Sequence, residues 1–144
     1  MAGRRRGFTL VEAVMALALS GLLVLGGVQA VGRLGPKLRL QSGIWEVTSG
    51  LGQARFRAIM AGEPIRVRFF RSGFALERYD AAASAWRASR RSVLEGVAVR
   101  ANNAPIFYPQ GTVSNMATIT VSNSRGSYRI TVAITGRIRT VRVS

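Results

Sequence analysis

Residues 7–32 read GFTLVEAVMALALSGLLVLGGVQAVG, and this stretch decides the fold. From Ala13 to Gly32 it holds 20 consecutive residues without a charge. At a rise of about 1.5 Å per residue, a helix of that length spans roughly 30 Å, the thickness of the hydrocarbon core of a bilayer. The sequence therefore predicts one membrane-spanning helix in the N-terminal part of the chain.

The charges that flank this stretch predict its orientation. Arg4, Arg5 and Arg6 precede it, and a basic flank is retained in the cytoplasm, so the rest of the chain is expected on the opposite side of the membrane. Glu12 lies at the edge of the apolar run, where an unpaired carboxylate costs a few kcal/mol. Two interpretations of Glu12 follow: a functional intramembrane acid, or a carboxylate at the level of the lipid headgroups, where the cost fades.

Two other processing signals overlap this region. Arg5-Arg6-Gly7-Phe8 has the core of a twin-arginine export signal, and Val28-Gln29-Ala30 has the small-x-small spacing of a signal peptidase site. Either would remove the whole apolar helix. An ordinary signal peptide has about 7 to 15 apolar residues and does not begin with a glutamate, so the sequence favours a retained helix.

The run Gly7-Phe8-Thr9-Leu10-Val11-Glu12, after a basic hexapeptide and before an apolar stretch, resembles the N-terminal signature of type IV prepilins and type II secretion pseudopilins. The resemblance implies that residues 1–7 are a leader that prepilin peptidase removes after Gly7. It also implies N-methylation of Phe8 and a transmembrane helix over residues 8–35. Glu12 would neutralise the N-terminal amine of an adjacent subunit, because a buried amine and a buried carboxylate are each costly alone and acceptable as a pair.

Residues 36–144 have the pattern of a helix followed by strands. Apolar residues at alternating steps of four and three predict that the helix resumes after Pro36 and runs to about Met60: Leu40, Ile44, Val47, Leu51, Ala54 and Ala58. Gly62-Glu63-Pro64 should end it. Alternating or β-branched runs then predict antiparallel strands over residues 65–69, 74–79, 93–100, 117–121, 128–134 and 138–143.

Two details of the strand pattern are less regular. Ile138 and Val141 fall on opposite faces of the last strand, so we expect a β-bulge near Arg139. Residues 80–92 carry no pattern from which an element is predicted. Turns are expected at residues 123–126 and at Gly136.

Several segments of this part resemble the GspH/FimT branch of the pilin-like superfamily: Gln53–Ile59, Pro64–Phe69, Ile106–Thr112 and Gly136–Arg139. The resemblance implies an α+β, pilin-like fold, with a long N-terminal helix packed on an antiparallel β-sheet head. The membrane half of that helix would occupy residues 8–35. Residues 36–144 would form the amphipathic stalk half and a β-rich periplasmic head.

The charge of the chain favours anionic partners. It has 21 basic and 6 acidic residues, and removal of the leader arginines leaves 18 basic residues and a formal difference of +12. Residues 102–144 contain no acid, and their arginines are candidates for binding double-stranded DNA: Arg125, Arg129, Arg137, Arg139 and Arg142. A solvated basic face, contact with anionic headgroups, and contact with an acidic partner pilin are the alternatives.

The absence of cysteine and histidine bears on catalysis. It removes the thiol nucleophile, the commonest general base and the commonest metal ligand, so neither an enzyme nor a metal or cofactor site is predicted.

We expect a minor pilin or pseudopilin of the bacterial inner membrane, whose partners are other pilins, prepilin peptidase and membrane lipid. Whether it serves a type II secretion pseudopilus, a type IV pilus, or DNA uptake in natural transformation stays open at this point.

Overall fold

The computed structural model describes residues 9–143, without the side chains of residues 25–31 and 33. It divides into two compact units, one up to Gly35 and the other from Pro36 onward, which are described separately. The predicted leader cleavage site at Gly7 and Phe8 lies outside the described residues.

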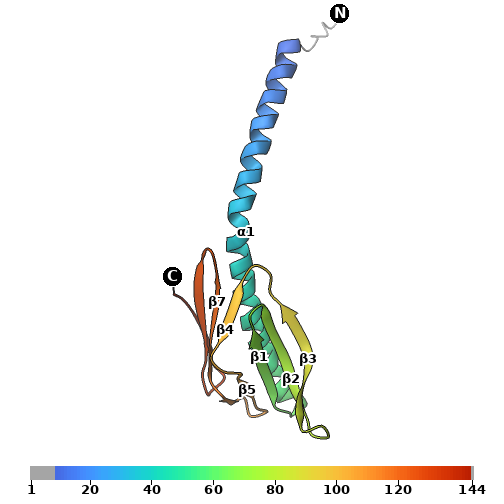
Figure 1. Cartoon of the computed structure of the whole chain (residues 1–144), viewed down its shortest axis with the longest axis vertical. Helices are drawn as coiled ribbons and strands as arrows, with labels where there is room; N and C mark the ends of the chain where they lie inside the picture. Colours follow the sequence, from blue (N-terminus) through green and yellow to red (C-terminus); the bar gives the residue numbers. More distant parts are fainter. Residues whose placement is uncertain (1–8, 144) are drawn as a thin grey trace, which may run out of the picture. The chain divides into compact units, whose positions relative to one another are not determined.

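The first unit contains the N-terminal part of helix α1, which spans Leu10–Ala61 (Figure 1). Large apolar side chains in this part are exposed, including Leu17, Leu22 and Leu23. Among the described residues, no helix is both long enough and apolar enough to cross a membrane.

The helix does not resume after Pro36 as expected from the sequence, because α1 continues through this residue without a break. A proline inside a helix removes the hydrogen bond that its own N–H would donate to the carbonyl four residues earlier. The Pro36 carbonyl oxygen accepts a hydrogen bond from Asn123 Nδ2 at 2.7 Å, which ties this turn of the helix to the end of β7. The end of α1 is as predicted: it stops at Ala61, and Gly62 takes a left-handed φ of +67° before Glu63 and Pro64.

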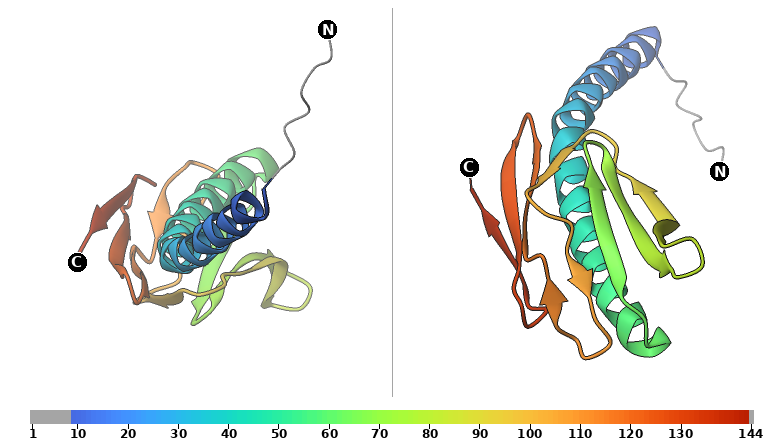
Figure 2. Two further views of the ribbon diagram at one scale, coloured as in Figure 1. Left: turned by 90° about the horizontal axis from the view of Figure 1, so that it is seen from above. Right: turned by 60° about the horizontal axis from the view of Figure 1, so that its bottom comes forward.

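In the described part of the second unit, the strands form two antiparallel sheets that both lie against α1 (Figure 2). The first sheet has the order β3-β2-β1-β5-β6, and the second has the order β4-β7-β8-β9. The bounds of the first sheet are β1 Ile65–Phe70, β2 Gly73–Asp80, β3 Ala85–Val93, β5 Ile106–Phe107 and β6 Val113–Ser114. Those of the second are β4 Ala98–Ala101, β7 Ala117–Asn123, β8 Gly126–Val132 and β9 Ile138–Arg142.

One apolar core joins the helix to both sheets. The predicted helical stripe faces it, with Val47, Leu51 and Ala54 fully buried. The first sheet adds Val67, Leu76 and Phe107, and the second adds Val99, Val121, Ile119 and Ile130. Because the residues of this core lie between Leu40 and Val132, residues 36–144 contain the whole cluster, and the expected helix-on-sheet α+β architecture is confirmed.

The middle of the chain differs from the sequence prediction. The strand expected over residues 93–100 does not exist as one element, because Val93 ends β3 and β4 begins at Ala98. Residues 85–93, most of which had no predicted structure, form the long edge strand β3, with mostly exposed side chains. An exposed edge strand has no buried face, so it lacks the alternation from which strands are recognised.

The bulge expected near Arg139 is also wrong. β9 pairs with β8 in regular register from Val132 and Ile138 to Tyr128 and Arg142. β9 is an edge strand, so Val141 can stay exposed on the outer face without a register shift. The irregularity lies instead between β2 and β3, where Ser89 is an extra residue opposite the Leu76–Glu77 step.

Candidate functional site

Glu12 lies in the first turn of α1, and Thr9 caps that turn. The Glu12 backbone N–H donates to Thr9 Oγ1 at 3.3 Å, and the Ala13 N–H donates to the Thr9 carbonyl oxygen at 3.1 Å. The Thr-x-x-Glu spacing is that of a capping box. The Glu12 side chain is exposed, and no ion pair to it occurs among the described residues. Its carboxylate lies at the positive end of the helix dipole and is available to a cationic partner.

The outer face of the second sheet, opposite α1, brings together only some of the predicted arginines. Thr131 pairs with Arg139 and Val141 pairs with Arg129, so the two arginines are diagonal neighbours on the same face. Arg100 of β4, which was not among the sequence candidates, joins them, since Arg100 pairs with Thr120 and Thr120 with Arg129. Two strand spacings, about 10 Å, therefore separate the Arg100 and Arg129 positions.

The remaining sequence candidates lie elsewhere. Arg142 pairs with Tyr128, whose ring packs on the core, so Arg142 belongs to the opposite face of β9. Arg125 lies in the turn between β7 and β8, and Arg137 in the turn before β9. Arg100 was missed because the sequence predicted one strand over residues 93–100. With the observed bounds of β4, Ala98–Ala101, side-chain alternation places Arg100 on the exposed face.

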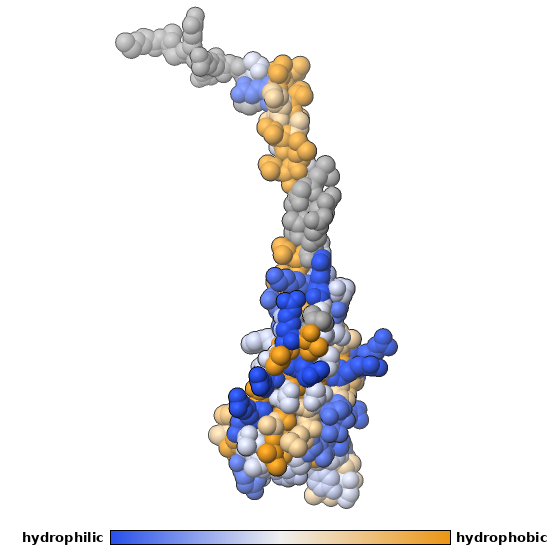
Figure 3. All heavy atoms as spheres, turned by 90° about the vertical axis from the view of Figure 1, so that its left-hand side faces the viewer, coloured by the Kyte–Doolittle hydropathy of each residue, from blue (hydrophilic) through white to orange (hydrophobic). Residues whose placement is uncertain are grey.

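We call this outer face the arginine–hydroxyl face, because most side chains around its arginines carry a hydroxyl, with Val141 beside Arg129 as an apolar exception. The hydroxyl side chains are Thr118, Thr120, Ser122, Ser127 and Thr131. Its strands contain no acid. Figure 3 views the side of the head that carries this sheet and shows hydrophilic side chains over much of it, with apolar ones between them. Guanidinium and hydroxyl donors on one face of a sheet suit the oxygens of phosphate groups.

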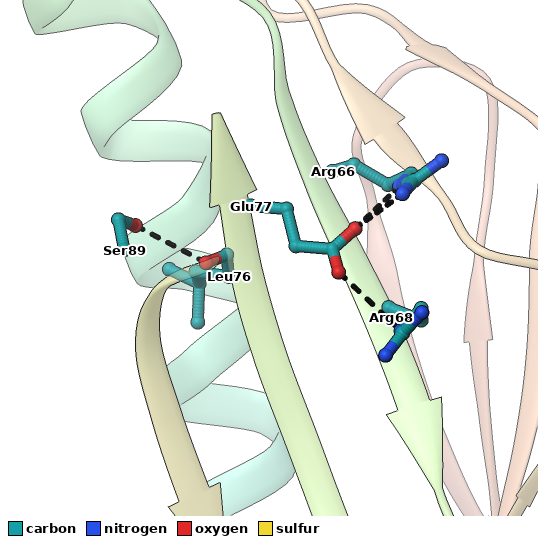
Figure 4. Close-up of polar contacts among 5 residues, drawn as sticks. All are labelled: Arg66, Arg68, Leu76, Glu77 and Ser89. Carbon is teal, nitrogen blue, oxygen red and sulfur yellow. Dashed lines mark hydrogen bonds and ion pairs between the residues drawn. The ribbon is translucent and has the colours of Figure 1, made fainter. Parts of the chain in front are cut away.

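Three acids of the head, by contrast, form ion pairs with arginines of the first sheet. On the outer face of β1 and β2, Glu77 is only 4% exposed and forms ion pairs with Arg66 at 2.5 Å and Arg68 at 3.3 Å (Figure 4). The Arg66 guanidinium also lies 4.6 Å from the centre of the Trp86 ring. Further ion pairs join Arg78 to Glu63 and Arg87 to Asp80. Four arginines of β1–β3 therefore have a carboxylate partner, whereas no arginine of the arginine–hydroxyl face forms an ion pair with a described residue.

Arg55 of α1 connects one turn of each sheet: Gly111 lies between β5 and β6 of the first sheet, and Gly136 lies between β8 and β9 of the second. Its Nη1 donates to the Gly136 carbonyl oxygen at 3.3 Å. A Cβ built on Gly136 would lie 2.7 Å from the Gly111 carbonyl oxygen and 2.9 Å from Arg55 Cζ. Gly136 also has a φ of +76°, so only glycine fits here without strain. The turns that carry Gly111 and Gly136, each a weak motif in the sequence, are thus packed together against Arg55, and Arg137 follows directly.

The described residues also bear on whether the chain has a metal or nucleophile site. Within the described part of the chain, no group of three or more Asp and Glu side chains lies close enough to hold a metal ion. The serines and threonines have no histidine to act as a base anywhere in the sequence.

Comparison with known proteins identifies two family models along the chain. Residues 3–28 match the prokaryotic N-terminal methylation motif, and residues 45–136 match type II transport protein GspH. Comparison with curated protein sequences finds no significant match.

Solved structures with similar folds include EpsH, FimU and GspH. The minor pseudopilin EpsH from the type 2 secretion system of Vibrio cholerae has a TM-score of 0.58 and 17% identity, over 74% of this chain and 95% of that chain. The type IV minor pilin FimU of Pseudomonas aeruginosa has a TM-score of 0.60 and 17% identity, over 73% and 90%. GspH of E. coli has a TM-score of 0.55 and 13% identity, over 73% and 89%. At these identities the structures show a common fold.

Proposed function

Because this chain belongs to the GspH family of minor pseudopilins and pilins, we propose that it is a minor subunit of a type II secretion pseudopilus or a type IV pilus. The observation that carries the proposal is the order of the two family matches, with the methylation motif on the apolar N-terminal segment and the GspH match on the head. The subunit would insert by residues 8–35 into the inner membrane, with its head in the periplasm, and assemble there with other pilins or pseudopilins.

The proposed maturation is cleavage after Gly7 by prepilin peptidase and methylation of Phe8. It is supported by the match to the N-terminal methylation motif. The intact mass of protein extracted from membranes of cells with an active prepilin peptidase should equal that of residues 8–144 plus one methyl group. A mature chain that begins at Val31, as expected for signal peptidase, would contradict this proposal.

Glu12 is proposed to pair with the N-terminal amine of the neighbouring subunit. Its support is the exposed carboxylate without an ion pair in the described residues. Glu12→Ala should be processed and inserted normally but incorporated poorly into filaments, as measured by shearing and immunoblotting. Thr9→Ala is the matched control, because it removes the helix cap and keeps the charge. Equal incorporation of Glu12→Ala and wild type would refute the pairing role.

A second candidate function is DNA binding during uptake, favoured by the arginine–hydroxyl face. Phosphate contacts of this kind do not read sequence, and the logarithm of the affinity falls with the logarithm of salt concentration at a slope of about −0.9 per neutralised phosphate. The double substitution Arg129→Gln and Arg139→Gln should weaken binding to all duplex sequences alike. It should also flatten that slope by up to about two units. Arg137 lies in the turn beside this face and is expected to contribute as a further contact.

Arg142→Gln supplies the matched control, because Arg142 is on the same strand as Arg139 but on its opposite face. Anisotropy titrations of labelled duplex DNA with residues 36–144, at several salt concentrations, measure both quantities. If Arg142→Gln weakens DNA binding as much as Arg139→Gln does, the net positive charge of the head, and not the arginine–hydroxyl face, accounts for the binding. Absence of binding at low salt would leave filament assembly as the function of the chain.

A further inference from the structure

A bulge in β3 opens a cavity between that strand and the end of α1. Ser89 is the extra residue, and its hydroxyl donates to the Leu76 carbonyl oxygen at 3.1 Å (Figure 4). After the bulge, β3 is held to the helix by Arg90, whose Nη1 donates to Gln53 at 2.8 Å. Before the bulge, the strand leaves room for a cavity of about 530 Å3 that residues from α1, β1, β2 and β3 line. Because a bulge bends and twists its strand, the extra residue Ser89 accounts for the space between β3 and the end of α1.

The cavity, which we call the hairpin pocket, is apolar along its helical wall. Phe56 and Met60 lie on this wall and are 63% and 70% exposed, and Ile65 and Ala88 continue the apolar lining. Both large side chains are on the last turns of α1, one turn apart. A paired Phe and Met left exposed around a cavity is the pattern of a surface that another apolar group covers.

The rest of the lining is basic. Three guanidinium groups line the pocket together with one carboxylate: Arg57, Arg78 and Arg87 with Asp80. Arg87 is held by Asp80 at 2.7 Å, whereas Arg78 has only a 3.6 Å contact to Glu63. Arg57 makes no ion pair with any described residue. The pocket thus combines an apolar wall with at least one guanidinium group that lacks a carboxylate.

We propose that the hairpin pocket docks an acidic segment of another protein, with a large apolar side chain of that segment against Phe56 and Met60. A carboxylate of the same segment pairs with Arg57. A second copy of this chain suits the pocket poorly, because its net charge after leader removal is +12 and three of its five head acids already pair with its own arginines. The partner is therefore a different, acidic protein. This names the chemistry of one partner of the proposed filament subunit and so rests on that function.

The direct test uses the full chain in nanodiscs of phosphatidylcholine and a short labelled peptide that has one phenylalanine among aspartates. Two further peptides replace either the aspartates by asparagine or the phenylalanine by serine. We expect the first peptide to bind, and each replacement to weaken binding by about tenfold, since each removes one of the two contacts. Equal binding of the asparagine peptide, or no binding of the first peptide, would overturn the proposal.

Variants of the chain locate the binding. Phe56→Ala should weaken binding of the first peptide by about tenfold, and Arg57→Gln by about threefold, with the second effect lost at high salt. Trp45→Ala and Arg142→Gln are matched controls, since Trp45 is exposed on the same helix but away from the pocket. These substitutions change exposed or half-exposed side chains, so the fold should survive them. Controls that weaken binding as much as the pocket variants would overturn the proposal.

The lack of cysteine in the chain allows a second readout. Met60→Cys introduces a single thiol in the pocket lining, and the first peptide should slow its alkylation while the asparagine peptide does not. If nanodiscs enriched in phosphatidylglycerol, or duplex DNA, protect this thiol as well as the peptide does, the pocket takes lipid or nucleic acid and the proposal is wrong. This assay needs no filament, so its failure is distinguishable from the failure of assembly in cells.

Discussion

Gly136→Ala should destabilise the head, although it adds only one methyl group to a turn. Its φ of +76° costs an alanine about 1 to 2 kcal/mol, of which the lower entropy of the unfolded alanine chain offsets part. The added methyl would also lie 2.7 Å from the Gly111 carbonyl oxygen and 2.9 Å from Arg55 Cζ, so backbone and guanidinium must both move. Such overpacking adds about 1 to 3 kcal/mol. We expect a total loss of about 2 to 4 kcal/mol in the free energy of unfolding.

Gly62→Ala separates the two causes. Gly62 has a φ of +67°, close to that of Gly136, but a Cβ built on it has no neighbour within 4 Å. This control should therefore cost only about 1 kcal/mol. Urea unfolding of residues 36–144, followed by circular dichroism, measures both values. At about 4 to 8 °C per kcal/mol, the two variants should also differ clearly in Tm. The packing of the two turns on Arg55 would be refuted if both variants lost the same stability.

Two further predictions concern polar contacts of the head. Glu77→Gln should lower the free energy of unfolding in urea by about 2 to 3 kcal/mol, because it leaves the half-buried Arg66 without a carboxylate. Glu63→Gln is the control and should cost less than about 1 kcal/mol, because its ion pair is exposed. Equal costs would mean that the burial of Glu77 is unimportant. Asn123→Ala should lose about 1 kcal/mol and speed hydrogen exchange near Pro36, because the amide donor to its carbonyl is removed; unchanged exchange there would contradict this contact.

The sequence predicted the helix and most strands because their burial is periodic. The stripe that includes Val47, Leu51 and Ala54 lies on the core, and β1 alternates buried and exposed residues as expected. β3 was missed because both of its faces are largely exposed. The break predicted at Pro36 was wrong, because α1 continues through this residue despite the local preference of proline to end a helix.

The candidate surface was predictable in composition but not in geometry. An acid-free, arginine-rich C-terminal segment is visible in the sequence, but strand register decides which arginines share a face. Alternation along an unbulged β9 separates Arg139 from Arg142, and the pairing of β4 with β7 adds Arg100 from a strand some forty residues earlier. The role of Arg55 was equally hidden, because the two turns that it contacts are far from it along the chain.

The distribution of charge between the two sheets has a consequence for how the head responds to salt. Around β1–β3, Arg66, Arg68, Arg78 and Arg87 meet carboxylates, and the carboxylate of Glu77 is buried, so screening should change the Glu77 ion pairs little. The arginines of the outer face of the second sheet lie close to one another, and no carboxylate occurs on its strands, so their mutual repulsion is relieved either by salt or by an anionic partner. Salt should therefore stabilise the free head slightly while it weakens any polyanion complex. A rise in Tm of residues 36–144 with salt, reduced in the Arg129→Gln and Arg139→Gln double variant, would place the uncompensated charge on that face; an equal rise in both proteins would place it elsewhere.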